Sequence, residues 1–124
     1  MPTDEVLVPI SAIESFAVLR AQLTNISTLE QGWNGSDAEP PNEQSLATAA
    51  TILDRIEARQ QGLARVAASN HGGVCLAWVS ASKSGILEVL NSGDLTATTS
   101  DGNTWTVSDI DQALDTLTSF VGVA

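Results

Sequence analysis

The sequence predicts one α+β domain over residues 1–124: two N-terminal helices, then a four- to five-stranded antiparallel β-meander, then one C-terminal helix, with the helices packed on one face. Three observations predict this class. A length of 124 residues suffices for one domain and is short for two. A hydrophobic content of 43% beside a charged content of 16% is typical of a chain that folds. The apolar residues recur at helical spacing up to Leu63 and alternate after it.

The first helix is expected to begin at Ser11, because Ser11 and Glu14 can form a capping box. Apolar residues then recur at steps of three and four from Ile13, and Leu29 closes the segment. The glycines and prolines of residues 32–41 would interrupt a continuing helix, so an ordered loop or a linker follows.

The second helix is expected to follow Asn42, a good N-cap residue. Glu43 then lies in the first turn, where the helix dipole favours a negative charge. Ala49 and Ala50 leave room for close packing on the first helix or on the sheet. Gly62 marks the expected end of the helix.

Five short runs of β-forming residues follow, at 64–69, 74–80, 86–91, 95–99 and 104–107. Connections this short join antiparallel neighbours, which predicts a meander. Asp101 and Gly102 predict a two-residue hairpin, because both central positions of that turn need a positive φ. The last helix is expected to begin at Ser108, with Asp109 and Asp111 in its first turn.

Alternation divides the strand residues between two faces of the sheet. The face expected beneath the helices holds Val74, Leu76, Trp78, Leu87, Val89, Trp105 and Val107. The opposite face holds Cys75, Ala77, Val79, Ile86, Glu88, Leu90, Thr96 and Thr98. This second face is too apolar for open water. We therefore expect a homodimer whose interface comprises Ala77, Val79, Ile86 and Leu90.

Few side chains of this chain can act as bases or nucleophiles. His71 and Cys75 could together activate a thiolate or supply half of a zinc site, but no second cysteine or histidine completes a zinc tetrahedron. His71 lies in a turn with no evident group to orient its ring. We favour a simpler interpretation, in which the histidine lies in a solvated turn and the cysteine is a buried, unreactive thiol. We therefore expect no catalytic Cys-His pair, no metal and no cofactor.

The loop around Trp33 is the most distinctive local feature. A tryptophan is too costly to leave fully exposed, so we expect Trp33 to be mostly buried, filling a gap between helices and sheet. Trp33, Asn34 and Asp37 of the loop, together with His71, are the candidate contacts for a ligand or a partner. Asp37 and Glu39 could also hold a hard cation with Asn34, although solubility and helix-dipole complementation explain these carboxylates better.

The charge balance excludes several classes of function. A net charge of −10, from 5 basic and 15 acidic residues, argues against a nucleic-acid binder that neutralises phosphates. No segment approaches the apolar length that spans a bilayer, and the acidic N-terminus is unlike a secretory signal, so we expect a cytoplasmic protein without membrane contact. Every charged residue after Lys83 is acidic, and such a surface can occupy a basic site on a partner.

One stretch of the chain resembles a known group. A Gly32-Trp33-Asn34-Gly35 loop with Pro40-Pro41 is followed by a helix and then by Gly72-Gly73-Val74-x-Leu76-x-Trp78. This arrangement resembles small uncharacterised bacterial proteins that pair a Gly-Trp-Asn/Asp-Gly loop and a helix with a Gly-Gly-Ile/Val-x-Leu-x-Trp strand. The resemblance covers residues 29–90 and implies a shared architecture, with no activity attached. The chain departs from the pattern at Ser36, Asp37, Cys75, Ala77 and Val79.

These observations favour a non-enzymatic interaction or small-ligand-binding module that forms a homodimer. One alternative is a small enzyme that uses His71 with the loop carboxylates. The other is an acidic inhibitor that occupies a basic site on a partner protein. A concave pocket lined by His71 and Trp33 would favour the enzyme, and a flat acidic sheet face would favour the inhibitor.

Overall fold

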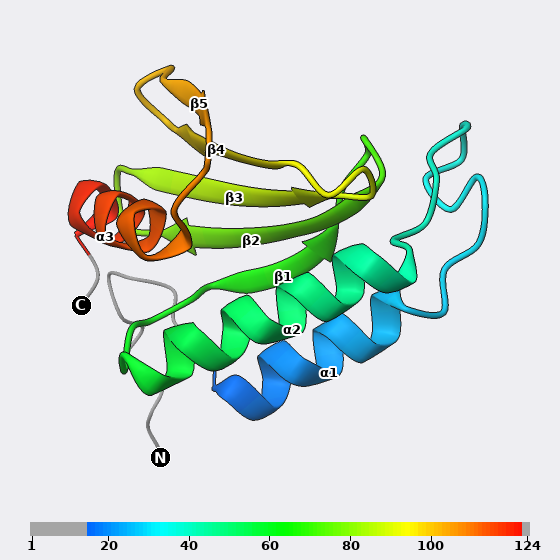
Figure 1. Cartoon of the computed structure of the whole chain (residues 1–124), viewed down its shortest axis with the longest axis horizontal. Coiled ribbons are helices and arrows are strands. Elements are labelled where there is room, and N and C mark those ends of the chain that lie inside the picture. The colour runs from blue at the N-terminus through cyan, green and yellow to red at the C-terminus, as the bar shows by residue number, and fades with distance from the viewer. Residues whose placement is uncertain (1–14, 123–124) are drawn as a thin grey trace, which may run out of the picture.

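The computed structural model describes residues 15–122, which form three helices and one five-stranded antiparallel sheet. The helices are α1 (Phe16–Ile26), α2 (Glu43–Ala58) and α3 (Ile110–Val121). The strands are β1 (Arg65–Ala68), β2 (Gly73–Val79), β3 (Ser84–Leu90), β4 (Leu95–Thr99) and β5 (Thr104–Thr106). The strands lie in the sheet in chain order (Figure 1), which confirms the predicted α+β meander.

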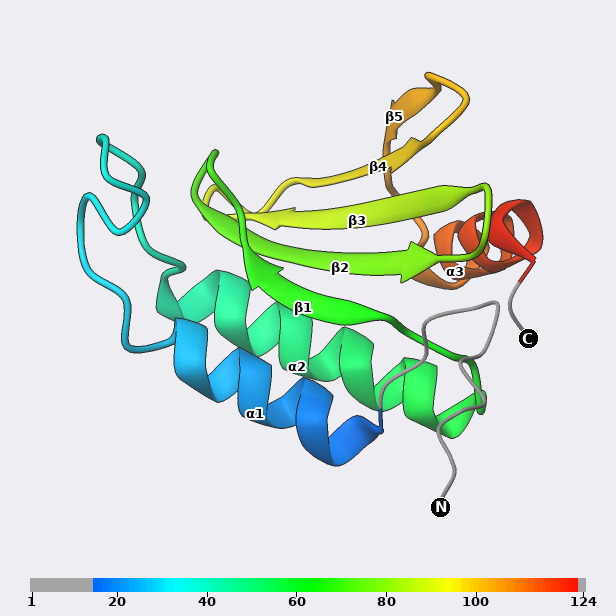
Figure 2. The ribbon, with the colours of Figure 1, turned by 180° about the vertical axis from the view of Figure 1, so that it is seen from behind.

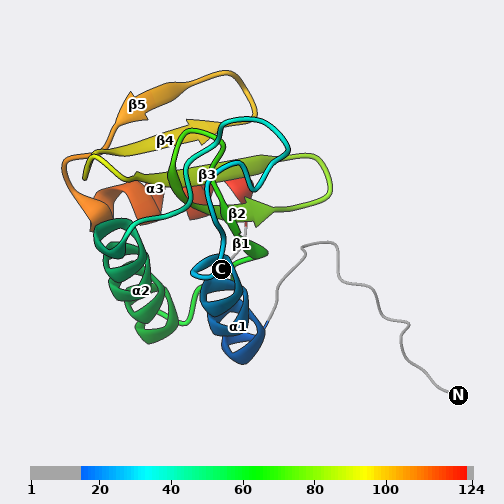
Figure 3. The same cartoon turned by 90° about the vertical axis from the view of Figure 1, so that its right-hand side faces the viewer.

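The three helices pack on the same face of the sheet, as predicted (Figure 3). α1 contacts β1, α2 contacts β2 and β3, and α3 lies against β2, β3 and β4. The core between them includes Leu19, Ile52, Leu53, Leu76, Trp78, Leu87, Leu114 and Leu117, all fully buried. Removing these side chains from water is the main contribution to the stability of the fold.

α1 follows Ser15 and ends earlier than the sequence predicts. Ser15 is its N-cap, and the Ser15 hydroxyl accepts a hydrogen bond from the Val18 amide at 3.3 Å. The predicted capping box of Ser11 and Glu14 lies outside the described residues. α1 ends at Ile26, where the hydroxyl groups of the next polar residues bond back to main-chain carbonyls and compete with further helix formation.

α2 begins as predicted and ends early. The Asn42 side chain accepts a hydrogen bond from the Ser45 amide at 2.8 Å, which confirms Asn42 as the N-cap. The helix stops at Ala58 and does not continue to Gly62. Gln60 takes a φ of 57°, in the left-handed region, and so makes the turn that Gly62 was expected to make.

The β4–β5 turn differs from the predicted two-residue hairpin. Gly102 has a φ of 99°, whereas Asp101 does not have the positive φ that such a turn would need. The Thr99 amide bonds to the Asn103 carbonyl at 2.9 Å, so the loop is longer. α3 then begins after Asp109, whose side chain accepts from a first-turn amide and caps the helix.

Candidate functional site

The sheet face opposite the helices is not covered by any helix of residues 15–122. The strand register places its side chains in rows that cross the sheet. One row contains Arg65, Ala77, Ile86, Thr98 and Thr104. The next row contains Ala67, Cys75, Glu88, Thr96 and Thr106. The predicted assignment of residues to this open face is therefore confirmed.

A pocket of about 370 Å³ lies on the open face, at β1, β2 and β3. Ala67, Cys75 and Ala77 line it, and their short side chains leave the space that the pocket occupies. Arg65 and Ile86 also line it and carry the longer side chains beside that space. We call this space the open-face pocket.

Glu88 organises the polar end of the open-face pocket. Its Oε2 atom accepts a hydrogen bond from the Ser69 hydroxyl and lies 2.8 Å from Nδ1 of His71. The Ser69 hydroxyl in turn accepts a bond from the His71 amide at 3.0 Å. Oε1 of Glu88 has a longer contact, 3.4 Å, with the Thr96 hydroxyl, so this oxygen keeps capacity to accept further hydrogen bonds.

These contacts set the charge states of two residues in the pocket. Burial acts to raise the pKa of Glu88, but hydrogen bonds from Ser69 and His71 outweigh it, and the pKa is lowered. Burial raises the pKa of the Cys75 thiol, and the negative charge of Glu88 raises it further, against smaller opposing effects of Ser69 and Arg65. Glu88 is therefore ionised, and Cys75 remains a thiol, at neutral pH.

The lowered pKa of Glu88 predicts how stability depends on pH. A carboxyl whose pKa is lower in the folded state stabilises the fold above its unfolded-state pKa, and the contribution is lost as pH falls through the folded-state pKa. Urea unfolding should therefore show that wild type exceeds Glu88→Gln in stability at neutral pH, by a margin that shrinks as pH falls below the ordinary value of 4.5. A margin that persists unchanged into strong acid would contradict this assignment.

Trp33 is partly buried and braces its own loop, as expected, but the prediction that it fills a gap between helices and sheet is wrong. The residue is half-buried and does not belong to the hydrophobic side chains that pack against the core of residues 15–122. Its indole N–H donates to the Glu39 carbonyl at 3.0 Å. The loop closes on itself through a 2.9 Å bond from the Gly32 amide to the Ala38 carbonyl, so the ring braces the loop's own backbone.

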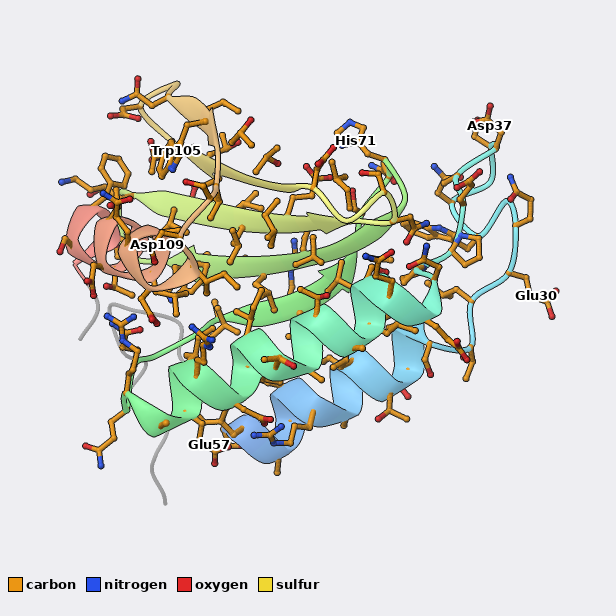
Figure 4. The ribbon with its side chains drawn as sticks, viewed as in Figure 1. Glu30, Asp37, Glu57, His71, Trp105 and Asp109 are labelled. Carbon is orange, nitrogen blue, oxygen red and sulfur yellow. The ribbon has the colours of Figure 1, made fainter. Side chains whose placement is uncertain are left out.

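The loop lies beside the β1–β2 turn at one end of the sheet (Figure 2). The Asn34 side chain donates to Oδ1 of Asn70 at 3.4 Å and so links the loop to that turn. Asp37 is exposed at the tip of the loop, away from His71 (Figure 4). Of the four predicted contact residues, His71 lines the open-face pocket, and the three loop residues do not.

The sequence reasoning missed Ser69 and Arg65 as pocket residues and the role of Glu88. The structure supplies the orienting group that His71 was expected to lack, because Glu88 contacts its ring. One signal was available: Glu88 is the only charged residue in the run of β-formers from Ile86 to Leu90. Within residues 15–122, no group of three or more His, Cys, Asp and Glu residues is arranged to hold a metal ion.

Comparisons with known proteins do not assign this chain to a family. No protein-family model, no curated protein and no solved structure matches this chain. The resemblance over residues 29–90 therefore stays a prediction. In the part of the chain that the structure describes, none of the helices combines the length and the apolar composition needed to cross a bilayer.

Proposed function

We propose that this chain is a binding module for a small molecule and that the open-face pocket is its site. One observation carries the proposal: a pocket of about 370 Å³ with small apolar side chains beside an ordered cluster of Glu88, Ser69 and His71. Ligand sites are typically of this size and combine an apolar lining with a few well-placed polar groups. The pocket has both properties.

The chemistry of the cluster supports binding over catalysis. The raised pKa of Cys75 leaves little thiolate to act as a nucleophile. The lowered pKa of Glu88 leaves it without a proton to donate at neutral pH. The Ser69 hydroxyl donates to Glu88 and not to the His71 ring, so the histidine does not activate it as in a serine hydrolase.

A small enzyme that uses His71 is the second candidate, because one observation favours it. The contact with Glu88 engages Nδ1 of His71, no residue of 15–122 bonds to Nε2, and the His71 side chain is 77% exposed. A histidine held in this way can act as a general base. Its carboxylate partner is Glu88 on β3, and neither Asp37 nor Glu39 of the loop.

The acidic inhibitor has less support. Asp111 pairs with Arg55 and Arg59, and Asp115 pairs with Arg59, on the helical side of the molecule. Glu88 contacts His71. Half of the six acidic residues after Lys83 therefore have basic partners within the chain, and the open face does not present the carboxylate array that a basic site would require.

A fragment screen by NMR tests the proposed function. Small-molecule fragments added to the isotope-labelled full chain should shift the amide signals of Ala67, Cys75 and Glu88 together. The amide of Ala49, buried in α2 on the helical face, is the internal control and should not move. A screen that yields no binder, or binders confined to the helical face, would overturn the proposal.

Self-association through the open face is proposed as a second property of the module. Val79 and Ile86, on neighbouring strands, are each 38% exposed, whereas Ala77 is buried at 8%. In a two-fold dimer this patch would meet its own copy. Because Ala77 and Ile86 also line the open-face pocket, self-association and ligand binding would compete for this face.

Val79→Glu is expected to convert the dimer to a monomer in sedimentation velocity, because a charge would be buried at the interface. Val18→Glu is the matched control, since Val18 is 40% exposed on α1, away from the open face. A wild-type protein that sediments as a monomer at every concentration would contradict the dimer.

A further inference from the structure

Two opposite charges line the open-face pocket from different strands. Arg65 is on β1 and Glu88 is on β3. Arg65 makes no ion pair with any residue of 15–122, whereas the other three arginines, on or next to α1 and α2, all pair with carboxylates. In a chain with 15 acidic and 5 basic residues, an arginine at a pocket that no carboxylate of residues 15–122 pairs with is available to a ligand.

The register fixes how far apart the backbone positions of Arg65 and Glu88 are. Arg65 faces Ala77, which faces Ile86, and Glu88 is two residues further along β3. Strand spacings of about 4.8 Å and a rise of about 3.3 Å per residue therefore separate the Cα atoms of Arg65 and Glu88 by roughly 12 Å. Within residues 15–122, Glu88 contacts His71, and no ion pair joins it to Arg65.

Cys75 lies between the two charges, opposite both Ala67 and Glu88. The negative charge of Glu88 raises the pKa of its thiol, and the positive charge of Arg65 lowers it. Both electrostatic fields therefore reach the middle of the pocket. The side chains around this point, Ala67 and Ala77, are apolar and small.

Both charged groups also have unused hydrogen-bonding capacity. Oε1 of Glu88 has its 3.4 Å contact with Thr96 and can accept more. The Arg65 guanidinium donates to no acceptor within residues 15–122, although its fork of N–H groups matches a carboxylate. A ligand that reached both groups would gain two charge-assisted hydrogen-bonding contacts.

We propose that the open-face pocket takes a small aliphatic zwitterion, with its carboxylate on Arg65, its ammonium group on Glu88 and its methylene chain over Ala67 and Ala77. This inference rests on the proposed function and names its ligand class. A simple anion would be repelled by the net charge of −10, and a simple cation would leave Arg65 unpaired. A zwitterion carries no net charge and pairs with both groups.

Three probes that share one aliphatic chain test the proposal: ε-aminocaproate with both charges, caproate with the carboxylate alone, and hexylamine with the ammonium alone. Each is titrated into the isotope-labelled full chain, and Kd is taken from the amide shifts of Cys75 and Ala77. We expect ε-aminocaproate to bind at least about fivefold more tightly than either partial probe, because each charge-assisted contact adds affinity.

Two substitutions assign each charge to its end of the probe. In Arg65→Gln, ε-aminocaproate should lose its advantage over hexylamine and keep its advantage over caproate. In Glu88→Gln, ε-aminocaproate should lose its advantage over caproate and keep its advantage over hexylamine. Arg55→Gln and Glu43→Gln are the matched controls, because they remove the same charges from the helical side and should leave all three affinities unchanged.

The outcomes separate this inference from the proposed function. Equal affinities for the three probes, or tightest binding of hexylamine or caproate, would overturn the zwitterion while leaving the pocket as a binding site. Fragment hits at the pocket without any probe binding there would do the same. Failure of the fragments and of all three probes to shift pocket amides would overturn both.

Discussion

Gly73→Ala is expected to destabilise the protein by about 3–5 kcal/mol, through backbone strain and overpacking together. Gly73 has a φ of 136°, which side-chain-bearing residues rarely adopt. An added Cβ would overlap the Val89 carbonyl oxygen and lie 2.9 Å from Cα of Leu90. These are main-chain atoms of the paired strand, so relief requires β2 and β3 to separate where Gly73 faces Leu90, two residues from the Cys75–Glu88 pair.

Urea unfolding measures the effect of this substitution against a matched control. Gly102→Ala also forces a side chain onto a positive φ, 99°, but its Cβ would meet no atom within 4 Å. It should therefore cost about 1 kcal/mol, from strain alone. Equal losses of stability in the two variants would show that contact between the added Cβ and β3 does not contribute to the cost at position 73.

Trp78→Ala is expected to cost about 3–5 kcal/mol, because the side chain is fully buried in the core and its removal leaves a large cavity. Trp33→Ala should cost about 1–2 kcal/mol, since Trp33 is half-buried and contributes one hydrogen bond and part of its apolar area. The two variants remove the same side chain from different surroundings.

Unfolding followed by far-ultraviolet circular dichroism measures both tryptophan variants, because it does not depend on the fluorescence of the residues being removed. A loss in Trp33→Ala as large as that in Trp78→Ala would contradict the surroundings described for the loop. It would support the earlier expectation that Trp33 fills a gap between helices and sheet.

The sequence predicts the fold well because local patterns determine it. The strand and helix periods, the Asn42 cap and the short turns specify the meander and the side of the sheet that the helices cover. Local patterns do not predict contacts between segments that are far apart in the sequence. Asn91, between β3 and β4, accepts from the Asn42 amide at 2.8 Å and donates to the Pro40 carbonyl at 3.0 Å, which fixes the end of the loop against the sheet.

The candidate site is harder to predict because it depends on contacts across strands. His71 stands out in the sequence as the only histidine, but its partner Glu88 is 17 residues away and becomes adjacent only through the register of β2 and β3. The sequence does not single out Arg65. Its importance comes from its place beside the pocket and from the lack of an ion pair with any residue of 15–122, and neither is visible in a sequence.

Whether the cluster of Glu88, Ser69 and His71 binds a ligand or activates a nucleophile is tested most directly by the rate of Cys75 alkylation across pH. Cys75 is the only cysteine, so the label reports one site. The protein unfolded in urea supplies the profile of an unperturbed thiol. If the cluster binds a ligand and does not activate a nucleophile, native Cys75 should react slowly at neutral pH. Its reactivity should rise at a higher pH than in the unfolded protein, because burial and Glu88 raise the pKa of the thiol. His71→Ala should show the same pH profile as wild type. Rapid labelling below neutral pH that disappears in His71→Ala would contradict it and favour the enzyme.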